Sequence, residues 1–143
     1  MITSYSEEET KDFAQEFVSN LCVGDVVLLH GDLGMGKSVF ARACIRSLVG
    51  EDVLEVPSPT FTLVQMYDAD LAPLWHFDLY RLSDPSEIYE IGWDDALDGG
   101  ILFVEWAERL GGLLPKKRIE VTLSQPSGDG NVRNIEVVKY GYS

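Results

Sequence analysis

Basic residues, cysteines and long apolar runs are scarce in this 143-residue chain. Its 11 Lys and Arg residues stand against 24 Asp and Glu, for a formal net charge of −13 at pH 7. Tight binding to nucleic acid requires a broad cationic face that displaces counterions from phosphates, so direct nucleic-acid binding is not expected. The acidic surface instead favours docking to a basic patch on another protein.

The few cysteines and the lack of long apolar runs argue against disulfide-rich, zinc-binding, membrane-spanning and secreted proteins. Cys22 and Cys44 are too few for a disulfide framework and lack the spacing of a zinc site. Both fall in segments that we expect to be helical, where cysteine packs as a small hydrophobe. No apolar stretch approaches the length of a membrane span, and the residues after Met1 lack the regions of a secretory leader. We therefore expect a cytoplasmic protein without membrane contact.

A glycine-rich segment carries the strongest functional signal. It matches the phosphate-binding pattern G-x-x-x-x-G-K-[ST] and reads Gly31, Asp32, Leu33, Gly34, Met35, Gly36, Lys37 and Ser38. The glycines let successive N–H groups point at phosphate oxygens, Lys37 adds a positive charge, and Ser38 offers a hydroxyl to Mg²⁺. The alternative, a turn that merely joins a strand to a helix, does not require the lysine and serine in register.

Hydrophobic periodicity and turn residues predict the elements around this loop. The length predicts one domain over residues 1–143. The loop and its flanking elements predict an α/β fold of the P-loop NTPase class, with a mixed, mainly parallel central sheet flanked by helices. The expected helices begin after Ser6, with Glu9 completing a capping box, at Lys37 with a stop at Gly50, and at Asp84-Pro85 with an end near Leu97. The expected strands are 26–29, an antiparallel pair at 63–67 and 74–82 with a six-residue connection, a central parallel strand at 101–106, and a C-terminal β-hairpin of 118–124 and 134–140.

Hydrolysis requires more than the loop, and two carboxylates are candidates for the added roles. A second anchor for Mg²⁺ and a group that orients water are both needed. Glu105 ends the most hydrophobic strand, where it is either this anchor or a solvated acid. Asp78 is either part of the site or a surface acid paired with Arg81. Thr60 is either a nucleotide-responsive hydroxyl or a turn residue.

The aromatic residues near these acids have simpler interpretations. His76 is better explained as a packed strand residue than as a catalytic base. Trp75, Trp93 and Trp106 are first of all core or interface aromatics.

Four segments, taken in order and spacing, resemble the TsaE family, formerly called YjeE. They are GDLGMGKS, SPTFTLVQMY, HFDLYRLSDPSEI and VEWAE. The family comprises small bacterial ATPases of the machinery that makes threonylcarbamoyladenosine on tRNA. The resemblance extends from Gly31 to about Pro115 and weakens in the N-terminal helix and the C-terminal hairpin.

The resemblance implies roles for individual residues. It places the loop lysine on Lys37, the magnesium hydroxyl on Ser38 and a switch-like threonine on Thr60. By analogy Glu105 binds Mg²⁺ and Asp78 serves the water or the γ-phosphate, although the sequence also allows the reverse.

The resemblance also implies a site, ligands and partners. Trp106 is expected as a site wall or a partner contact. The expected ligands are ATP and Mg²⁺, and the expected partners are TsaD and TsaB, which carry the transfer chemistry and connect the protein to tRNA only indirectly. The six arginines include none in a clearly finger-like position, which favours completion of the site by a partner.

Three other functions share some of these features. Small-molecule kinases share the loop, but they use an arginine-bearing lid that is not visible here. A signalling GTPase would carry an N-K-x-D motif, which the sequence lacks. A nucleotide-gated binding module with negligible turnover remains an alternative.

Overall fold

A seven-stranded sheet organises the part of the chain that the computed structural model describes, namely residues 2–31, 37–51, 54–57, 59, 62–125 and 132–142. In chain order the elements are β1 (Ile2–Ser4), α1 (Glu7–Val18), β2 (Val26–His30), α2 (Lys37–Val49), β3 (Val64–Asp68), β4 (Pro73–Asp78), the 3₁₀ segment η1 (Pro85–Ile91), α3 (Trp93–Leu97), β5 (Ile101–Glu105), the 3₁₀ segment η2 (Ala107–Leu113), β6 (Arg118–Ser124) and β7 (Arg133–Tyr140).

The strand order is β1-β7-β6-β2-β5-β4-β3. The four central strands, β6, β2, β5 and β4, are mutually parallel, whereas the outer pairs β1–β7, β7–β6 and β4–β3 are antiparallel. This confirms the expected mixed sheet with a parallel centre and a closing hairpin. Because parallel strands point the same way, the carboxyl ends of β2, β5 and β4 lie along one edge, where open α/β sheets bind ligands.

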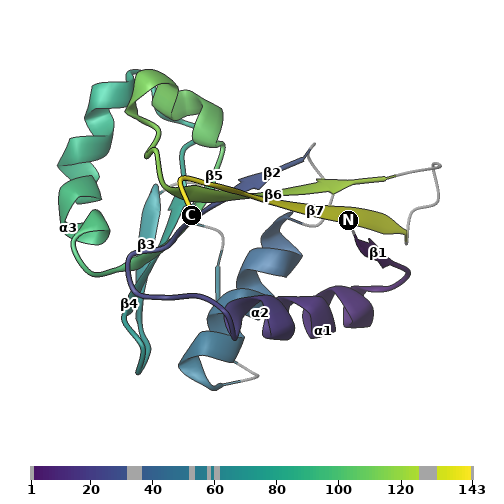
Figure 1. Ribbon diagram of the computed structural model, residues 1–143. Coiled ribbons are helices and arrows are strands. Elements are labelled where there is room, and N and C mark those ends of the chain that lie inside the picture. The colour runs from purple at the N-terminus through teal and green to yellow at the C-terminus, as the bar shows by residue number, and fades with distance from the viewer. Residues whose placement is uncertain are drawn as a thin grey trace.

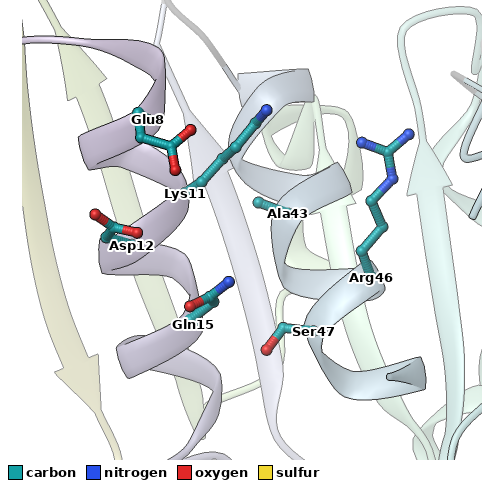
Figure 2. Close-up of a pocket in the computed structure, with 7 residues that line it drawn as sticks. All are labelled: Glu8, Lys11, Asp12, Gln15, Ala43, Arg46 and Ser47. Atoms are coloured by element: carbon teal, nitrogen blue, oxygen red, sulfur yellow. The ribbon is translucent and has the colours of Figure 1, made fainter. Parts of the chain in front are cut away.

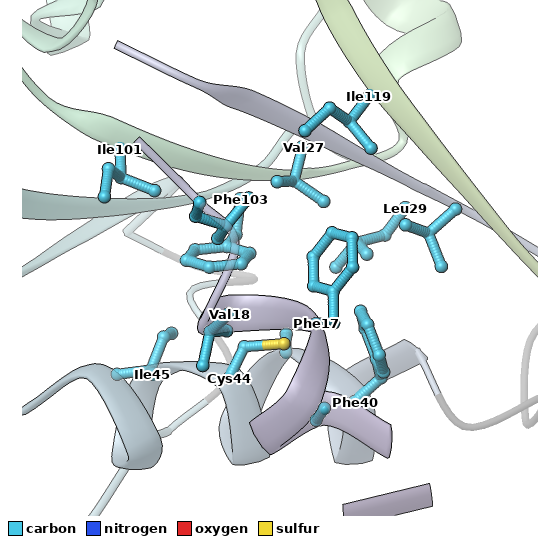
Figure 3. Packing of buried hydrophobic residues seen from close by; sticks show 14 of the residues in the cluster. Phe17, Val18, Val27, Leu29, Phe40, Cys44, Ile45, Ile101, Phe103 and Ile119 are labelled. Atoms are coloured by element: carbon cyan, nitrogen blue, oxygen red, sulfur yellow. The ribbon is translucent and has the colours of Figure 1, made fainter. Parts of the chain in front are cut away.

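Helical segments cover both faces of the sheet (Figure 1). Alternate residues of β2 face opposite sides, since Val27 and Leu29 belong to a cluster with α1 and α2, while Val26 and Leu28 belong to a cluster with η1, α3 and η2. Figure 3 shows the first cluster, in which Phe40 of α2 and its neighbours meet the sheet. Each fully buried large side chain of this kind contributes about 1.5–3 kcal/mol. The first cluster thereby holds α1 and α2 against the sheet.

Local signals account for the ends of α1 and α2. Ser6 caps α1, because its side chain accepts a hydrogen bond from the Glu9 N–H at 3.1 Å. Gly50 ends α2 with φ +85°, a left-handed conformation that costs glycine little, and its N–H donates to the Arg46 carbonyl at 2.9 Å. Both were predicted from the sequence.

Several element boundaries differ from prediction. The second strand of the β3–β4 hairpin ends at Asp78 rather than Leu82, and the connection between the strands is residues 69–72 rather than six residues. The helix expected from Pro85 to Leu97 is interrupted at Gly92, whose φ is +93° and beside which an added Cβ would meet Trp75 at 3.0 Å. The short strand β1 was not predicted.

The cysteines also differ from expectation. Cys22 is exposed and lies beyond the end of α1 at Val18, so its predicted place in a helix is wrong. Cys44 is buried in α2, as expected, and burial raises the pKa of its thiol. Within the described ranges, no helix is long and apolar enough to cross a bilayer.

Candidate nucleotide site

The two predicted carboxylates lie side by side at the carboxyl edge of the sheet. Glu105 is the last residue of β5, Asp78 is the last residue of β4, and the two are direct partners in the parallel register. They share the face that carries Phe103 and Leu74, which is the face covered by α2. Glu105 is 4% exposed and Asp78 is 5% exposed. Neither is therefore the solvated acid that sequence alone allowed.

Lys37 enters the same region from the start of α2. The lysine is 7% exposed, and its Nζ lies 4.5 Å from the ring centroid of Trp106. No ion pair joins Lys37 to any carboxylate among the described residues. Among the described residues, the nearly buried Lys37 therefore contacts an aromatic face and no anionic side chain.

Trp106, the residue expected as a site wall, lies between the end of β5 and the start of η2, next to Lys37. It follows β5 directly and has φ +60°, a left-handed conformation that is uncommon for a bulky residue and turns the chain immediately after Glu105. Its ring lies 4.8 Å from that of Tyr80, which is half exposed. The role of Trp106 as a site wall stays a prediction, and Tyr80 is a neighbour that sequence reasoning missed.

Backbone hydrogen bonds fix the segment around Asp78. Its N–H donates to the Leu63 carbonyl at 3.0 Å, and its Oδ1 accepts from the Tyr80 N–H at 3.1 Å. The Leu79 N–H donates to the Glu105 carbonyl at 3.1 Å, which extends the β4–β5 pairing past Asp78. These bonds hold Asp78 and Glu105 at matching positions.

Part of the predicted site lies outside the described residues. This applies to Thr60 and to five loop residues, Asp32, Leu33, Gly34, Met35 and Gly36. Gly31 is described directly after β2, and Ser38 is described as an exposed residue in the first turn of α2. Leu63, whose carbonyl accepts the hydrogen bond from the Asp78 N–H, follows Thr60 by three residues in the sequence.

A second buried polar residue contacts the site. Nε2 of His76 lies 2.8 Å from Oε2 of Glu105, and His76 is 2% exposed. Sequence reasoning treated His76 as a packed strand residue, which its burial confirms, but missed the bond. The available signal was the two-residue spacing of His76 and Asp78, which places both side chains on one face of a strand.

A groove with charged walls lies between α1 and α2, away from this edge (Figure 2). It has a volume of about 260 Å³ and includes Glu8, Lys11, Asp12 and Arg46 among its lining residues. Of the predicted site residues that the structure describes, none lines this groove, and Asp78 and Glu105 lie instead at the strand ends.

The fold and the site together define a class of protein. A parallel strand leads into a phosphate-loop sequence and a helix that begins with its lysine, and the neighbouring parallel strand ends in a buried acid. This is the P-loop NTPase fold. The profile of one family within that class, described as "Threonylcarbamoyl adenosine biosynthesis protein TsaE", matches residues 4–135. The chain belongs to the TsaE family of tRNA threonylcarbamoyladenosine biosynthesis proteins.

Known relatives support this assignment across the length of the chain. The protein "tRNA threonylcarbamoyladenosine biosynthesis protein TsaE" of Rickettsia bellii is 45% identical over 130 residues, which cover 91% of this chain and 90% of that protein. Its namesake in Bacillus subtilis is 37% identical over 123 residues, covering 85% and 75%. The crystal structure of Bacillus subtilis YdiB superposes with a TM-score of 0.77 at 28% identity, covering 98% of this chain and 84% of that one.

Proposed function

We propose that this protein binds and hydrolyses ATP with Mg²⁺, and that hydrolysis drives or resets a TsaD–TsaB complex in the modification of tRNA. The observation that carries the proposal is a pair of nearly buried carboxylates, Asp78 and Glu105, at the carboxyl edge of the parallel strands, with the nearly buried Lys37 over the ring of Trp106, the residue after Glu105. A lysine at a helix start in the same region as two carboxylates is a combination suited to a polyphosphate and its metal ion.

The loop and the lysine supply the proposed grip on the triphosphate. The loop sequence at 31–38 would supply backbone N–H groups for the phosphates, the α2 N-terminus would add its partial positive charge, and Lys37 would bind the outer phosphates. Trp106 would form one side of the site. The overall charge of −13 opposes an anionic ligand, so binding depends on these local groups.

The donor set fits Mg²⁺. Mg²⁺ prefers oxygen ligands and few protein groups, and here the Ser38 hydroxyl and the Glu105 carboxylate would hold it. Across the described ranges, no cluster of three or more His, Cys, Asp or Glu residues is arranged as a metal cage. When bound, Mg²⁺ neutralises charge that develops on the β- and γ-phosphate oxygens. Asp78 beside Glu105 orients the attacking water, and Thr60 senses the γ-phosphate.

Acidity of the chain favours a protein partner over direct contact with tRNA. Hydrolysis by the isolated protein is expected to be weak, because no arginine of this chain is in a clearly finger-like position and a partner group completes the site. Function with a tRNA-modifying complex places the protein in the cytoplasm.

Phosphate release from ATP tests the proposal. The wild type should release phosphate slowly alone and faster with TsaD and TsaB, in a Mg²⁺-dependent way. Asp78→Asn should lower the rate at least about tenfold while ATP affinity changes much less, because Asp78 acts on the attacking water. Glu105→Gln should lower both the rate and the part of the ATP affinity that depends on Mg²⁺, because Glu105 would hold the metal. Wild-type rates in both variants would refute the assigned roles. Phosphorylation of a metabolite without any effect of TsaD and TsaB would instead establish a kinase, and no phosphate release would favour a binding module.

A further inference from the structure

His76 and Glu105 form a buried pair that the proposed roles do not explain. His76 belongs to β4, and its side chain shares the α2 face with those of Asp78 and Glu105, since it lies two residues before Asp78. Its Nε2 is 2.8 Å from Glu105 Oε2, and the two side chains are 3% and 5% exposed. The bond is therefore shielded from water. In such a buried environment, a hydrogen bond to a carboxylate holds its geometry well.

The polarity of this bond determines what remains on the histidine ring. A carboxylate oxygen only accepts, so Nε2 carries the proton and donates it. The other ring nitrogen, Nδ1, is buried and has no hydrogen-bond partner among the described residues. An unpaired buried polar atom destabilises a protein, and an apolar residue would avoid that loss.

Packing alone does not call for a histidine at this position. The neighbours on the same face, Leu74 and Phe103, are apolar and fully buried. A leucine or a phenylalanine would continue this cluster without an orphaned nitrogen. What the histidine adds is one N–H group directed at Glu105.

The direction of the bond explains its use. Asp78 is directly opposite Glu105 in the register, and two neighbouring carboxylates repel one another. His76 holds Oε2 of Glu105 toward the preceding residues of β4, and Oε1 makes no hydrogen bond to any described residue. One oxygen is thus anchored, and the other is left for a ligand.

We propose that His76 is a positioning residue that fixes the Glu105 carboxylate for Mg²⁺ in the nucleotide complex, an inference that rests on the proposed function. Residues that hydrogen-bond a metal ligand in this way typically change metal affinity by about 10- to 100-fold when mutated. His76 does not touch the nucleotide or the reacting water. Its substitution therefore affects the dependence on metal and leaves the metal-free grip on ATP intact.

Two matched substitutions separate positioning from packing. His76→Gln keeps a donor, because its amide N–H reaches the place of Nε2, whereas His76→Leu removes the donor. The dissociation constant of a non-hydrolysable ATP analogue is measured by calorimetry in EDTA and in Mg²⁺. The ratio of the two constants is the gain in affinity due to the metal. We expect His76→Leu to reduce this gain about tenfold, and His76→Gln to restore most of it.

Three controls complete the experiment. His30→Leu removes a similar bond, from His30 Nε2 to Glu120 Oε1 at 2.6 Å, on the opposite face of the sheet, and should leave the metal-dependent gain unchanged. In a Glu105→Gln background, His76→Leu should have no further effect on the gain, because the anchored carboxylate is already absent. Thermal unfolding identifies a variant that does not fold, in which case His76→Asn, too short to reach Glu105, replaces His76→Leu.

The outcomes are distinguishable. A wild-type gain in folded His76→Leu, or an equal loss in His76→Gln and His76→Leu, would overturn the positioning role while leaving the proposed ATPase intact. Failure of wild-type protein to bind the analogue under any condition would overturn both. An about tenfold loss of affinity in His76→Leu that also appears in EDTA would show a general effect on the site and would likewise overturn positioning.

Discussion

Lys37→Met should stabilise the protein without nucleotide and weaken its binding of ATP. Methionine is similar to lysine in length and lacks the charge. Lys37 is 7% exposed in the wild type, and among the described residues its ammonium has no carboxylate partner and faces the Trp106 ring at 4.5 Å, which offsets part of its desolvation. Desolvating a charge costs several kcal/mol, and a buried cation–π contact returns about 2 kcal/mol. Removing both should raise the free energy of unfolding by about 2 kcal/mol.

Thermal unfolding measures the change in stability, and calorimetry measures the change in ATP affinity. For a domain of this size, about 2 kcal/mol corresponds to a Tm increase of about 4–8 °C. A charge-assisted contact to phosphate is worth about 1.5–3 kcal/mol, so calorimetry should show an about 10- to 100-fold loss in affinity for ATP with Mg²⁺. ATP at about 100 times the wild-type Kd stabilises the wild type by about 2.7 kcal/mol and the variant by only about 0.4–1.4 kcal/mol, so ATP should reduce most of the advantage of the variant.

The control is Lys11→Met, at a lysine whose side chain is 43% exposed and which faces Glu7 at 3.8 Å. It should change the free energy of unfolding by less than about 0.5 kcal/mol. A lower Tm of Lys37→Met in the absence of nucleotide would refute the reasoning. Binding of ATP by this variant as tightly as by the wild type would also refute it.

Two further predictions concern the frame that holds the site. Gly100→Ala would place a Cβ 2.5 Å from the Ala96 carbonyl oxygen and 2.9 Å from Trp75, so urea unfolding should show that the free energy of unfolding falls by at least about 2 kcal/mol. The control Gly112→Ala, whose Cβ would have no atom within 4 Å, should change this free energy by less than about 0.5 kcal/mol. Equal effects of the two substitutions would contradict the packing account. Burial, and then the hydrogen bond that the Tyr142 hydroxyl donates to Asp25 at 2.6 Å, raise the pKa of Tyr142. This contribution to stability is present below the ordinary tyrosine pKa of about 10 and is lost as pH rises from there toward the folded pKa, so unfolding at about pH 9–12 should show a shallower decline for Tyr142→Phe than for wild type.

Sequence reasoning located the elements that local chemistry determines. Ser6 and Gly50 cap helices through bonds within a few residues, and the apolar run at 101–105 has the composition of a strand buried on both faces. Glu105 could be placed at the carboxyl edge because it is the acid that ends that run, directly after the apolar residues 101–104. These features depend on neighbours in the chain, so the sequence contains them.

Features that depend on distant contacts could not be predicted in the same way. Gly92 breaks the expected helix where Trp75, from another element, comes close, and β1 is a strand only because it pairs with β7. The burial of Asp78 depends equally on tertiary structure. The spacing of Asp78 and Arg81 could not distinguish a surface acid from a buried one, because the β4–β5 register is set by the whole sheet.

The opposite charges of the candidate site are held apart. Lys37 lies over Trp106, while Glu105 is bound by His76, and no ion pair among the described residues joins the lysine to this acid. A protein that needed these charges only for stability would pair them with each other, because separated buried charges are costly. Separate places suit two separate ligands, an anion for the lysine and a cation for the acid. The Mg²⁺ and ATP of the proposed function would supply both, which would allow a chain of net charge −13 to bind a nucleotide.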